Sequence, residues 1–213
     1  QMLNFNLLRG LLNVGCGQLS KAQGATPLGT GIFGPAVWRS RAWSFDCDQN
    51  LHLNNAKYFQ NMELAQWHML SSGTNILGQA LRKRWAFLIA SQMIRHKFSI
   101  KLNQEYEIQT QVVALDEQYV YVHQRFFDER NRLCAAALVS IMIREGKTTV
   151  LPSSLLQLAG IRAGNQQTLE WKRQEEHASL KVLTSFRSLT DEMKQEIERL
   201  NFEANKVKKE ASK

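Results

Sequence analysis

Residues 46–65 read DCDQNLHLNNAKYFQNMELA, and this stretch decides the fold. Its first half is mostly polar, and polar side chains at this density compete with regular backbone ladders and favour turns and caps. Over residues 56–70 the apolar residues recur at helical spacing, and one broad face of a helix is formed by Tyr58, Met62, Ala65 and Met69. Asn54 or Asn55 is the expected N-cap, and Gly73 is the expected end. The stretch therefore predicts a polar loop followed by one long amphipathic helix.

Strand-like segments lie on both sides of this helix. The residues from Val37 to Phe45 alternate apolar and polar side chains with a period of two. Four further strand candidates follow the helix: Trp85–Ile100, Glu105–Leu115, Tyr119–Asp128 and Leu133–Arg144. Short polar turns join the last three of them and favour antiparallel neighbours. Because one amphipathic helix needs a sheet to cover its apolar face, this order predicts an α+β fold in which a curved antiparallel sheet wraps around a single central helix.

Both ends of the chain differ from this centre. Residues 15–36 are rich in Gly, Ser, Thr and Pro, as expected of an extended arm or linker. Residues 152–160 suit a short helix, and Thr190 is the expected N-cap of a longer one. The longer helix carries a heptad seam formed by Met193, Ile197, Leu200, Ala204 and Val207. About two heptads favour docking on a partner over a free coiled coil.

We therefore expect three parts: a basic N-terminal arm (1–36), a central domain (37–150) and a C-terminal helical extension (151–213).

Composition narrows the class of protein. With 213 residues and 44% hydrophobic residues, the chain can build a real core. Its three cysteines form no CxxC pair, which argues against a disulfide framework and a structural zinc site and favours a reducing compartment. No apolar run reaches the roughly 18 residues that a membrane-spanning helix needs.

The net charge of +8 is unevenly placed, because no acidic residue precedes Asp46. An acid-free start that contains arginine and serine resembles a mitochondrial transit region or the segment after one, and a flexible basic tail is the plain alternative. We therefore expect the mitochondrial matrix, with the cytoplasm as the alternative.

The polar loop has the residue types of an acyl-transfer site. It carries Asp48, Asn50, His52, Asn54 and Asn55 directly before a helix start. A helix start presents unpaired backbone N–H groups and a partial positive charge, which can polarise a carbonyl or stabilise an oxyanion. A carboxylate a few residues earlier can act as general base or nucleophile. The alternative is a polar loop whose side chains only satisfy backbone groups.

Two resemblances favour the acyl-transfer interpretation. The string DQNLHLNNAKY at residues 48–58 resembles a motif of plant acyl-carrier-protein thioesterases. The wider run, from DCDQNLHLNNAKYFQNMELA through RHKFSI to EYEIQTQVVALDEQYVYVHQRF, is similar to the thioesterase-superfamily member-six group over roughly residues 40–145. The resemblance implies a hotdog fold in residues 37–150, a homodimer or a pair with another hotdog chain, no cofactor or metal, and acyl-CoA or acyl-carrier-protein thioesters as substrates.

The same resemblance implies roles for single residues. Asp48 would be the catalytic carboxylate, and Asn50 and His52 would assist it. The substrate-binding positions would be Leu51, Asn54, Asn55, Tyr58 and Glu63. Three departures make weak activity the expectation. Leu51 stands where many bacterial relatives have Gly, Gln66 replaces a common Arg, and residues 64–104 lack the downstream carboxylate of the plant enzymes.

Two basic clusters and the terminal segments leave other functions open. Arg82–Arg84 and the group around Arg95, Lys97 and Lys101 suit CoA phosphates, RNA phosphates or a solvated surface. We therefore carry two functions: a hydrolase of acyl thioesters, and a non-catalytic hotdog subunit of a large mitochondrial assembly that contains RNA, such as the mitochondrial ribosome. An acyl-binding regulator without turnover is a third.

Overall fold

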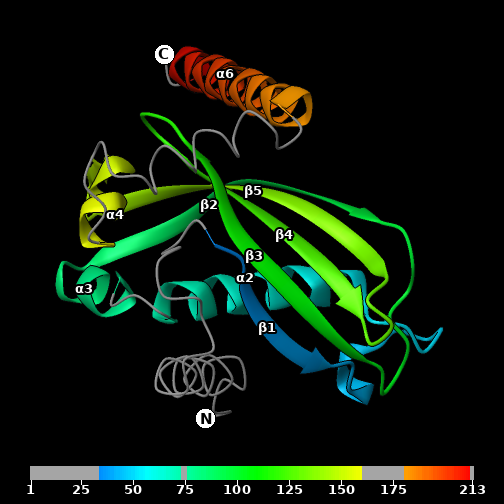
Figure 1. Cartoon of the computed structure of the whole chain (residues 1–213). Coiled ribbons are helices and arrows are strands. Elements are labelled where there is room, and N and C mark those ends of the chain that lie inside the picture. The colour runs from blue at the N-terminus through cyan, green and yellow to red at the C-terminus, as the bar shows by residue number, and fades with distance from the viewer. Residues whose placement is uncertain (1–33, 73–75, 160–179, 212–213) are drawn as a thin grey trace, which may run out of the picture. The chain divides into compact units, whose positions relative to one another are not determined.

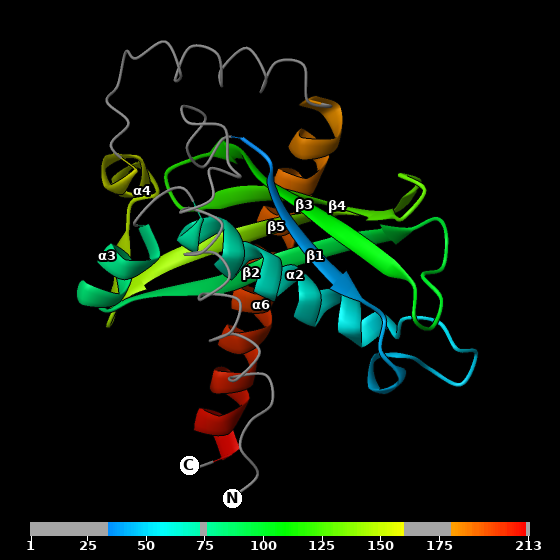
Figure 2. The ribbon, with the colours of Figure 1, turned by 60° about the horizontal axis from the view of Figure 1, so that its bottom comes forward.

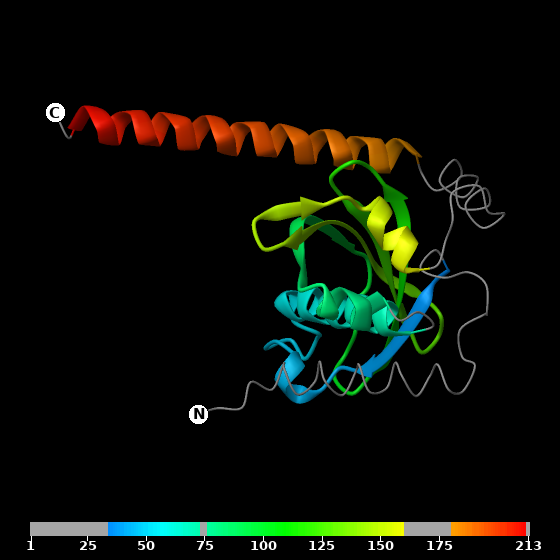
Figure 3. The same ribbon diagram turned by 90° about the vertical axis from the view of Figure 1, so that its left-hand side faces the viewer.

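The computed structural model describes residues 34–72, 76–159 and 180–211. Its centre is an antiparallel sheet that curves around one long helix (Figures 1 and 3). In chain order, the elements of this part are β1 (Ala36–Arg41), η2 (Ser44–Asp46), α2 (Asn55–Ser71), α3 (Ile76–Arg82), β2 (Trp85–His96), β3 (Glu105–Leu115), β4 (Val120–Asp128), β5 (Leu133–Glu145), β6 (Thr148–Val150) and α4 (Ser153–Leu158). The predicted α+β hotdog architecture is confirmed.

The sheet has the strand order β1-β3-β4-β5-β2, and β6 pairs with β5. All of these pairings are antiparallel. The register shifts between Val112 and Ala114 in β3 and between Ile89 and Ser91 in β2. Such bulges increase strand twist and bend a sheet, which allows it to close around a helix. Figure 2 shows α2 lying across the strands.

Helix α2 begins and packs as its sequence predicts. The Asn54 side chain accepts a hydrogen bond from the backbone N–H of Ala56 at 2.9 Å and caps the helix. The predicted face is buried, at Tyr58, Met62, Ala65 and Met69. The helix ends at Ser71, and the predicted stop, Gly73, lies outside the described residues.

A buried polar contact fixes α2 on the sheet. Gln66 on α2 donates from Nε2 to Oε1 of Gln124 on β4 at 2.9 Å. Gln124 in turn donates from Nε2 to the carbonyl of Met62 at 2.9 Å and to Oγ1 of Thr110 at 3.1 Å. Gln124 and Thr110 are completely buried. A satisfied polar network of this kind specifies one position of the helix, because any sliding leaves buried amides without partners.

Several boundaries differ from the sequence expectations. The first strand ends at Arg41 instead of Phe45, since residues 44–46 form a 3₁₀ turn and the alternation there comes from exposed Trp43 and Phe45. Strand β2 ends at His96 instead of residue 100. Helix α3 and strand β6 were not predicted, because each is too short to show periodicity.

The residues after 174 form a second compact unit, which contains α6 (Leu180–Ala211). Thr190 is not its N-cap as expected, since the helix begins ten residues earlier. The Thr190 hydroxyl instead donates to the carbonyl of Phe186 at 2.8 Å, a bond open to threonine inside a helix. The predicted division at residue 150 stays a prediction. Within the described ranges, no helix is both long and apolar enough to cross a membrane.

Candidate active site

The loop before α2 is closed around the carboxylate of Asp48. Its Oδ1 accepts hydrogen bonds from the backbone N–H groups of Asn50 at 2.9 Å and His52 at 3.2 Å. The backbone N–H of Asp48 donates to the carbonyl of His52 at 2.8 Å. Leu51, at the tip, has a φ of 57°, a left-handed conformation that an L-residue adopts only at a cost. Asp48 is therefore both a structural part of the loop and a carboxylate held in a fixed place.

A second loop supports this one. The backbone N–H of Leu53 donates to Ile100, and that of Leu102 donates to Leu51, both at 2.8 Å. Between these two hydrogen bonds, His52 and Lys101 form an isolated antiparallel β-bridge. The segment after β2 thus holds the Asp48 loop by short antiparallel pairing, which places both loops at the start of α2.

A pocket of about 180 Å³ lies between the Asp48 loop, the start of α2 and the end of β2. It is lined by Asp48, His52, Leu53, Asn55, Tyr58, His96, Lys97, Phe98 and Ser99. The first turn of α2 carries the partial positive charge of the helix dipole. The pocket therefore joins a carboxylate to an electropositive helix start, the two features that an acyl-transfer site needs.

Aromatic packing forms the inner wall of this pocket. The Tyr58 ring meets His96 edge-on at a centroid distance of 4.6 Å and Phe126 at 4.9 Å. Burial raises the pKa of Tyr58 to about 12, so its hydroxyl stays protonated at neutral pH. Burial also lowers the pKa of His96, which favours a neutral imidazole there.

Cys47 is a poor nucleophile in this setting. Burial and the nearby charges of Asp46 and Asp48 raise the pKa of its thiol, so the reactive thiolate is disfavoured. Within the described residues, no three His, Cys, Asp or Glu side chains gather closely enough to hold a metal ion.

Asp46, the other carboxylate of the motif, has a structural position. It is completely buried, its Oδ1 lies 3.5 Å from the Lys57 ammonium, and its backbone carbonyl accepts from the N–H of Asn54 at 2.9 Å. It ties the loop to the first turns of α2.

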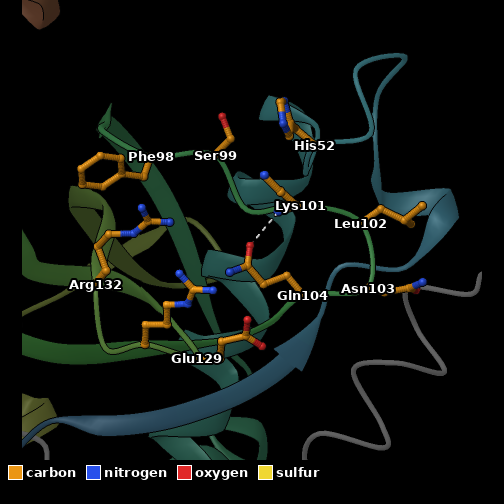
Figure 4. Close-up of a pocket in the computed structure, with 10 residues that line it drawn as sticks. His52, Phe98, Ser99, Lys101, Leu102, Asn103, Gln104, Glu129 and Arg132 are labelled. Carbon is orange, nitrogen blue, oxygen red and sulfur yellow. Dashed lines mark hydrogen bonds between the residues drawn. The ribbon is translucent and has the colours of Figure 1, made fainter.

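A larger cleft of about 620 Å³ adjoins the Asp48 pocket (Figure 4). The two share His52, Phe98 and Ser99. Beyond them the cleft is lined by Lys101, Leu102, Asn103, Gln104, Glu129, Arg130 and Arg132. Three of its residues are cationic and one is acidic, so the cleft suits an anionic ligand.

Arg132 is held in place on two sides. Its Nε and Nη2 lie 3.1 and 3.0 Å from Oδ2 of buried Asp128, and its guanidinium lies over the Phe98 ring at 4.4 Å from the centroid. Figure 4 shows Lys101 and Arg132 on opposite sides of the cleft. Both side chains therefore contribute positive charge to the same cleft.

An apolar slot of about 50 Å³ opens farther along α2. Residues of α2, of the sheet and of α4 line it: Glu63, Gln66, Trp67, Met69, Leu70, Phe87, Ile89, Val112, Val120, Val122, Ile141 and Leu155. It shares no residue with the Asp48 pocket. Eight residues separate Asn55 from Glu63, which is about 12 Å along a helix. One chain therefore keeps its carboxylate site and its apolar slot apart.

The predicted site residues fall into three groups. Asp48, His52, Asn55 and Tyr58 line one pocket. Asn50 and Leu51 are exposed on the loop, and Asn54 is used as the cap. Glu63 lines the apolar slot. The catalytic and substrate-binding roles stay predictions.

Sequence reasoning missed most of the basic cleft. Lys101 was singled out, but Arg130 and Arg132 come from the β4–β5 turn, about thirty residues later. The two arginines in that turn are the sequence feature from which the cleft's positive charge could have been predicted. Arg82–Arg84 does not join them, because it lies before β2 and a twelve-residue strand of about 40 Å separates it from Lys97.

Comparisons with known proteins agree with this geometry. A family model described as "Thioesterase-like superfamily" matches residues 43–178. A probable thioesterase of Saccharomyces cerevisiae, YBR096W, is 23% identical over 133 residues, which cover 62% of this chain and 57% of the yeast protein. The protein THEM6 of Danio rerio is 26% identical over 109 residues, 51% of this chain and 53% of that one. The predicted member-six resemblance is thereby confirmed.

A solved structure shows the same fold. SAV2348 of Staphylococcus aureus, determined in complex with CoA, superposes with a TM-score of 0.54 at 12% identity and covers 64% of this chain and 93% of its own. The chain spans a little over half the length of the curated relatives named above.

Proposed function

Because the chain belongs to the thioesterase-like superfamily, we propose that it hydrolyses acyl thioesters, with coenzyme A as the carrier. The observation that carries the proposal is the pocket that Asp48 lines together with Asn55, in the first turn of α2. The cation-lined cleft beside that pocket supports the choice of carrier.

The geometry supports a reaction in which Asp48 activates water. Oδ1 of Asp48 is held by two backbone N–H groups, so Oδ2 is the oxygen assigned to the water. The water attacks the thioester carbonyl carbon and gives its proton to Asp48. The first turn of α2, at Asn55, stabilises the oxyanion. When the oxyanion collapses, the carbon–sulfur bond breaks, and the leaving thiolate takes up the proton that Asp48 received, which restores the carboxylate.

The cleft supports a phosphate-bearing carrier. When the thioester carbonyl lies at Asp48, the thiol part of the substrate extends either past His52, Phe98 and Ser99, which both pockets share, or into solvent. Beyond these shared residues lie Lys101, Arg130 and Arg132, and guanidinium groups bind phosphate in a bidentate manner. We assign the phosphates of CoA to this cleft.

A homodimer completes the proposed site. Within the described residues, β2 pairs only with β5, and the strand exposes the large apolar side chains of Leu88, Ile89 and Met93. A long, apolar edge strand of this kind is a template for pairing with another strand. In an antiparallel pair of β2 strands, the start of one meets the end of the other. The partner's slot, lined at Phe87, then approaches the Asp48 pocket, lined at His96.

The first experiment removes the charge of Asp48 and keeps its shape. In Asp48→Asn, Oδ1 can still accept the two backbone hydrogen bonds, so the loop is retained. We expect kcat for acyl-CoA hydrolysis to fall by about 10² to 10⁴. Glu117→Gln, at an exposed turn residue, is the matched control and should match the wild type. Equal rates for all three proteins would rule out Asp48 as the base.

The second experiment tests the carrier. Arg130→Glu should raise KM for an acyl-CoA several-fold and leave KM for the same acyl group on pantetheine, which has no phosphate, unchanged. Arg82→Glu, in the distant basic cluster, is the control. Parallel assays with acyl-carrier protein separate the two carriers. An equal effect on both small esters would remove the phosphates from this cleft.

The third experiment tests the shared site by mixing two inactive chains. Asp48→Asn lacks the base, and Glu63→Trp fills the slot mouth. If each site combines Asp48 of one chain with the slot of its partner, mixed dimers contain one intact site and activity returns after co-refolding. If both parts act within one chain, no activity returns.

The second candidate function is a non-catalytic subunit of a large mitochondrial assembly that contains RNA. The exposed apolar seam of α6 favours it, since Met193, Ile197 and Leu200 are about half exposed on a helix outside the site. Co-migration of the tagged protein with a megadalton particle in mitochondrial extracts, together with the absence of hydrolysis by the wild type, would select it over the enzyme. The mitochondrial location itself stays a prediction, tested by cell fractionation.

A further inference from the structure

The second half of α6 carries an apolar stripe that no part of the proposed reaction uses. Met193, Ile197 and Leu200 are 53, 55 and 51% exposed, and they lie on one side of the helix at spacings of four and three residues. All the other side chains described between Asp191 and Glu203 are also exposed. A stripe of large apolar groups on a solvated helix is a binding surface for a partner.

We propose that α6 binds the α6 of a second copy of this chain, in parallel and in register, as a two-stranded coiled coil. The seam has heptad spacing, and Ile197 takes an a position with Met193 and Leu200 at d. A β-branched residue at a with leucine at d favours two parallel strands over larger bundles. The sequence continues the seam with Ala204 at a and Val207 at d.

The charges beside the seam fix the direction of pairing. Glu196 and Glu203 take g positions, and Lys194 and Asn201 take e positions. In an antiparallel pair, g faces g and e faces e, so glutamate meets glutamate. In a parallel pair, each g residue meets the e residue five positions later on the other helix. Glu203 then meets Lys208 of the second copy, and Glu196 meets the neutral Asn201.

These glutamates remain available for a partner. Both now contact Arg199 on their own helix, at 2.6 Å for Glu196 and 3.9 Å for Glu203. Their side chains are 52 and 58% exposed, and such surface pairs within a helix are weak.

Disulfide formation in the full-length chain tests direction and register. In a chain with Cys16 and Cys47 replaced by Ser, either Met193→Cys or Val207→Cys alone should give a covalent dimer under mild oxidation, because equivalent d residues face each other. A mixture of Met193→Cys and Ala204→Cys chains that yields only the 193–204 disulfide would show antiparallel pairing, in which d residues face a residues, and would overturn the proposal. So would the absence of any covalent dimer at both positions.

Charge variants test whether the partner is a second copy. Lys208→Glu should reduce the yield of the 193–193 disulfide several-fold, and Glu203→Lys should do the same. The double variant, which exchanges the two charges, should restore the yield. Lys209→Glu makes the same charge change at an f position of the heptad and is the matched control. If Lys208→Glu and Lys209→Glu have equal yields, or the double variant does not recover, Glu203 does not meet Lys208 of the second copy, and the proposed parallel, in-register pairing is overturned.

Discussion

Replacing Gln124 by leucine should lower the free energy of unfolding by about 2 to 4 kcal/mol. Gln124 is completely buried and makes three hydrogen bonds, to Gln66, to the Met62 carbonyl and to Thr110. Leucine fills a similar volume but leaves the Gln66 amide and the Thr110 hydroxyl buried without this partner. Each such group costs about 1 to 3 kcal/mol, and the gain from a new apolar side chain offsets part of the sum.

The second variant, Gln66→Leu, should cost about 1 to 3 kcal/mol, since it leaves Oε1 of Gln124 without its donor. In the double variant both amides are gone, and apolar groups replace them in matched positions. Its loss of stability should therefore be smaller than the sum of the two single losses by about 2 kcal/mol. Urea unfolding followed by tryptophan fluorescence measures all three values on the full-length chain.

The double-mutant cycle refutes the reasoning if the two losses simply add. Additivity within about 0.5 kcal/mol would mean that the amides act independently and that the network does not position α2. Since Gln66 also lines the apolar slot, the Gln66→Leu variant should, under the proposed acyl-CoA hydrolysis, change the preference for the acyl chain. If the variant lost stability but kept the wild-type preference for the acyl chain, the network would hold α2 in place without setting the shape of the slot.

Three further changes test the loop and its surroundings. Leu51→Gly should raise the free energy of unfolding by up to about 1 kcal/mol, because the strain of a φ of 57° in leucine exceeds the entropy that glycine loses on folding. Leu51→Val should lower the free energy of unfolding. Thermal unfolding of the two variants and the wild type measures both changes. Burial alone would raise the pKa of Asp128, but hydrogen bonds from the turn, above all from Arg132, hold that pKa below its usual 3.8. Its carboxylate therefore stabilises the fold above about pH 4, and this contribution is lost as the pH falls through the folded-state pKa. In urea unfolding between pH 2 and 6, the free energy of unfolding should fall more steeply with decreasing pH for the wild type than for Asp128→Asn. Lys57→Met should cost about 2 to 4 kcal/mol by removing the cation beside buried Asp46, and Lys57→Arg should retain most of the stability in the same denaturation assay.

The sequence by itself determined the parts that depend on neighbours along the chain. The N-cap, which the sequence narrowed to Asn54 or Asn55, and the buried face from Tyr58 to Met69 follow from spacing within one helix. The strands Glu105–Leu115 and Tyr119–Asp128 were placed within one residue, because alternation and polar turns are local signals. The loop that carries Asp48 was identified for the same reason.

Only the tertiary structure decided which distant residues meet. It brought His96 and Phe98 against the Asp48 loop, added Arg132 to Lys101, and placed Glu63 on a separate slot. Each of these results depends on how far a strand or helix extends before the chain returns, and on which strand lies beside which. Periodicity carries no information on those long-range pairings, because they are selected by the packing of the whole core and not by any segment alone.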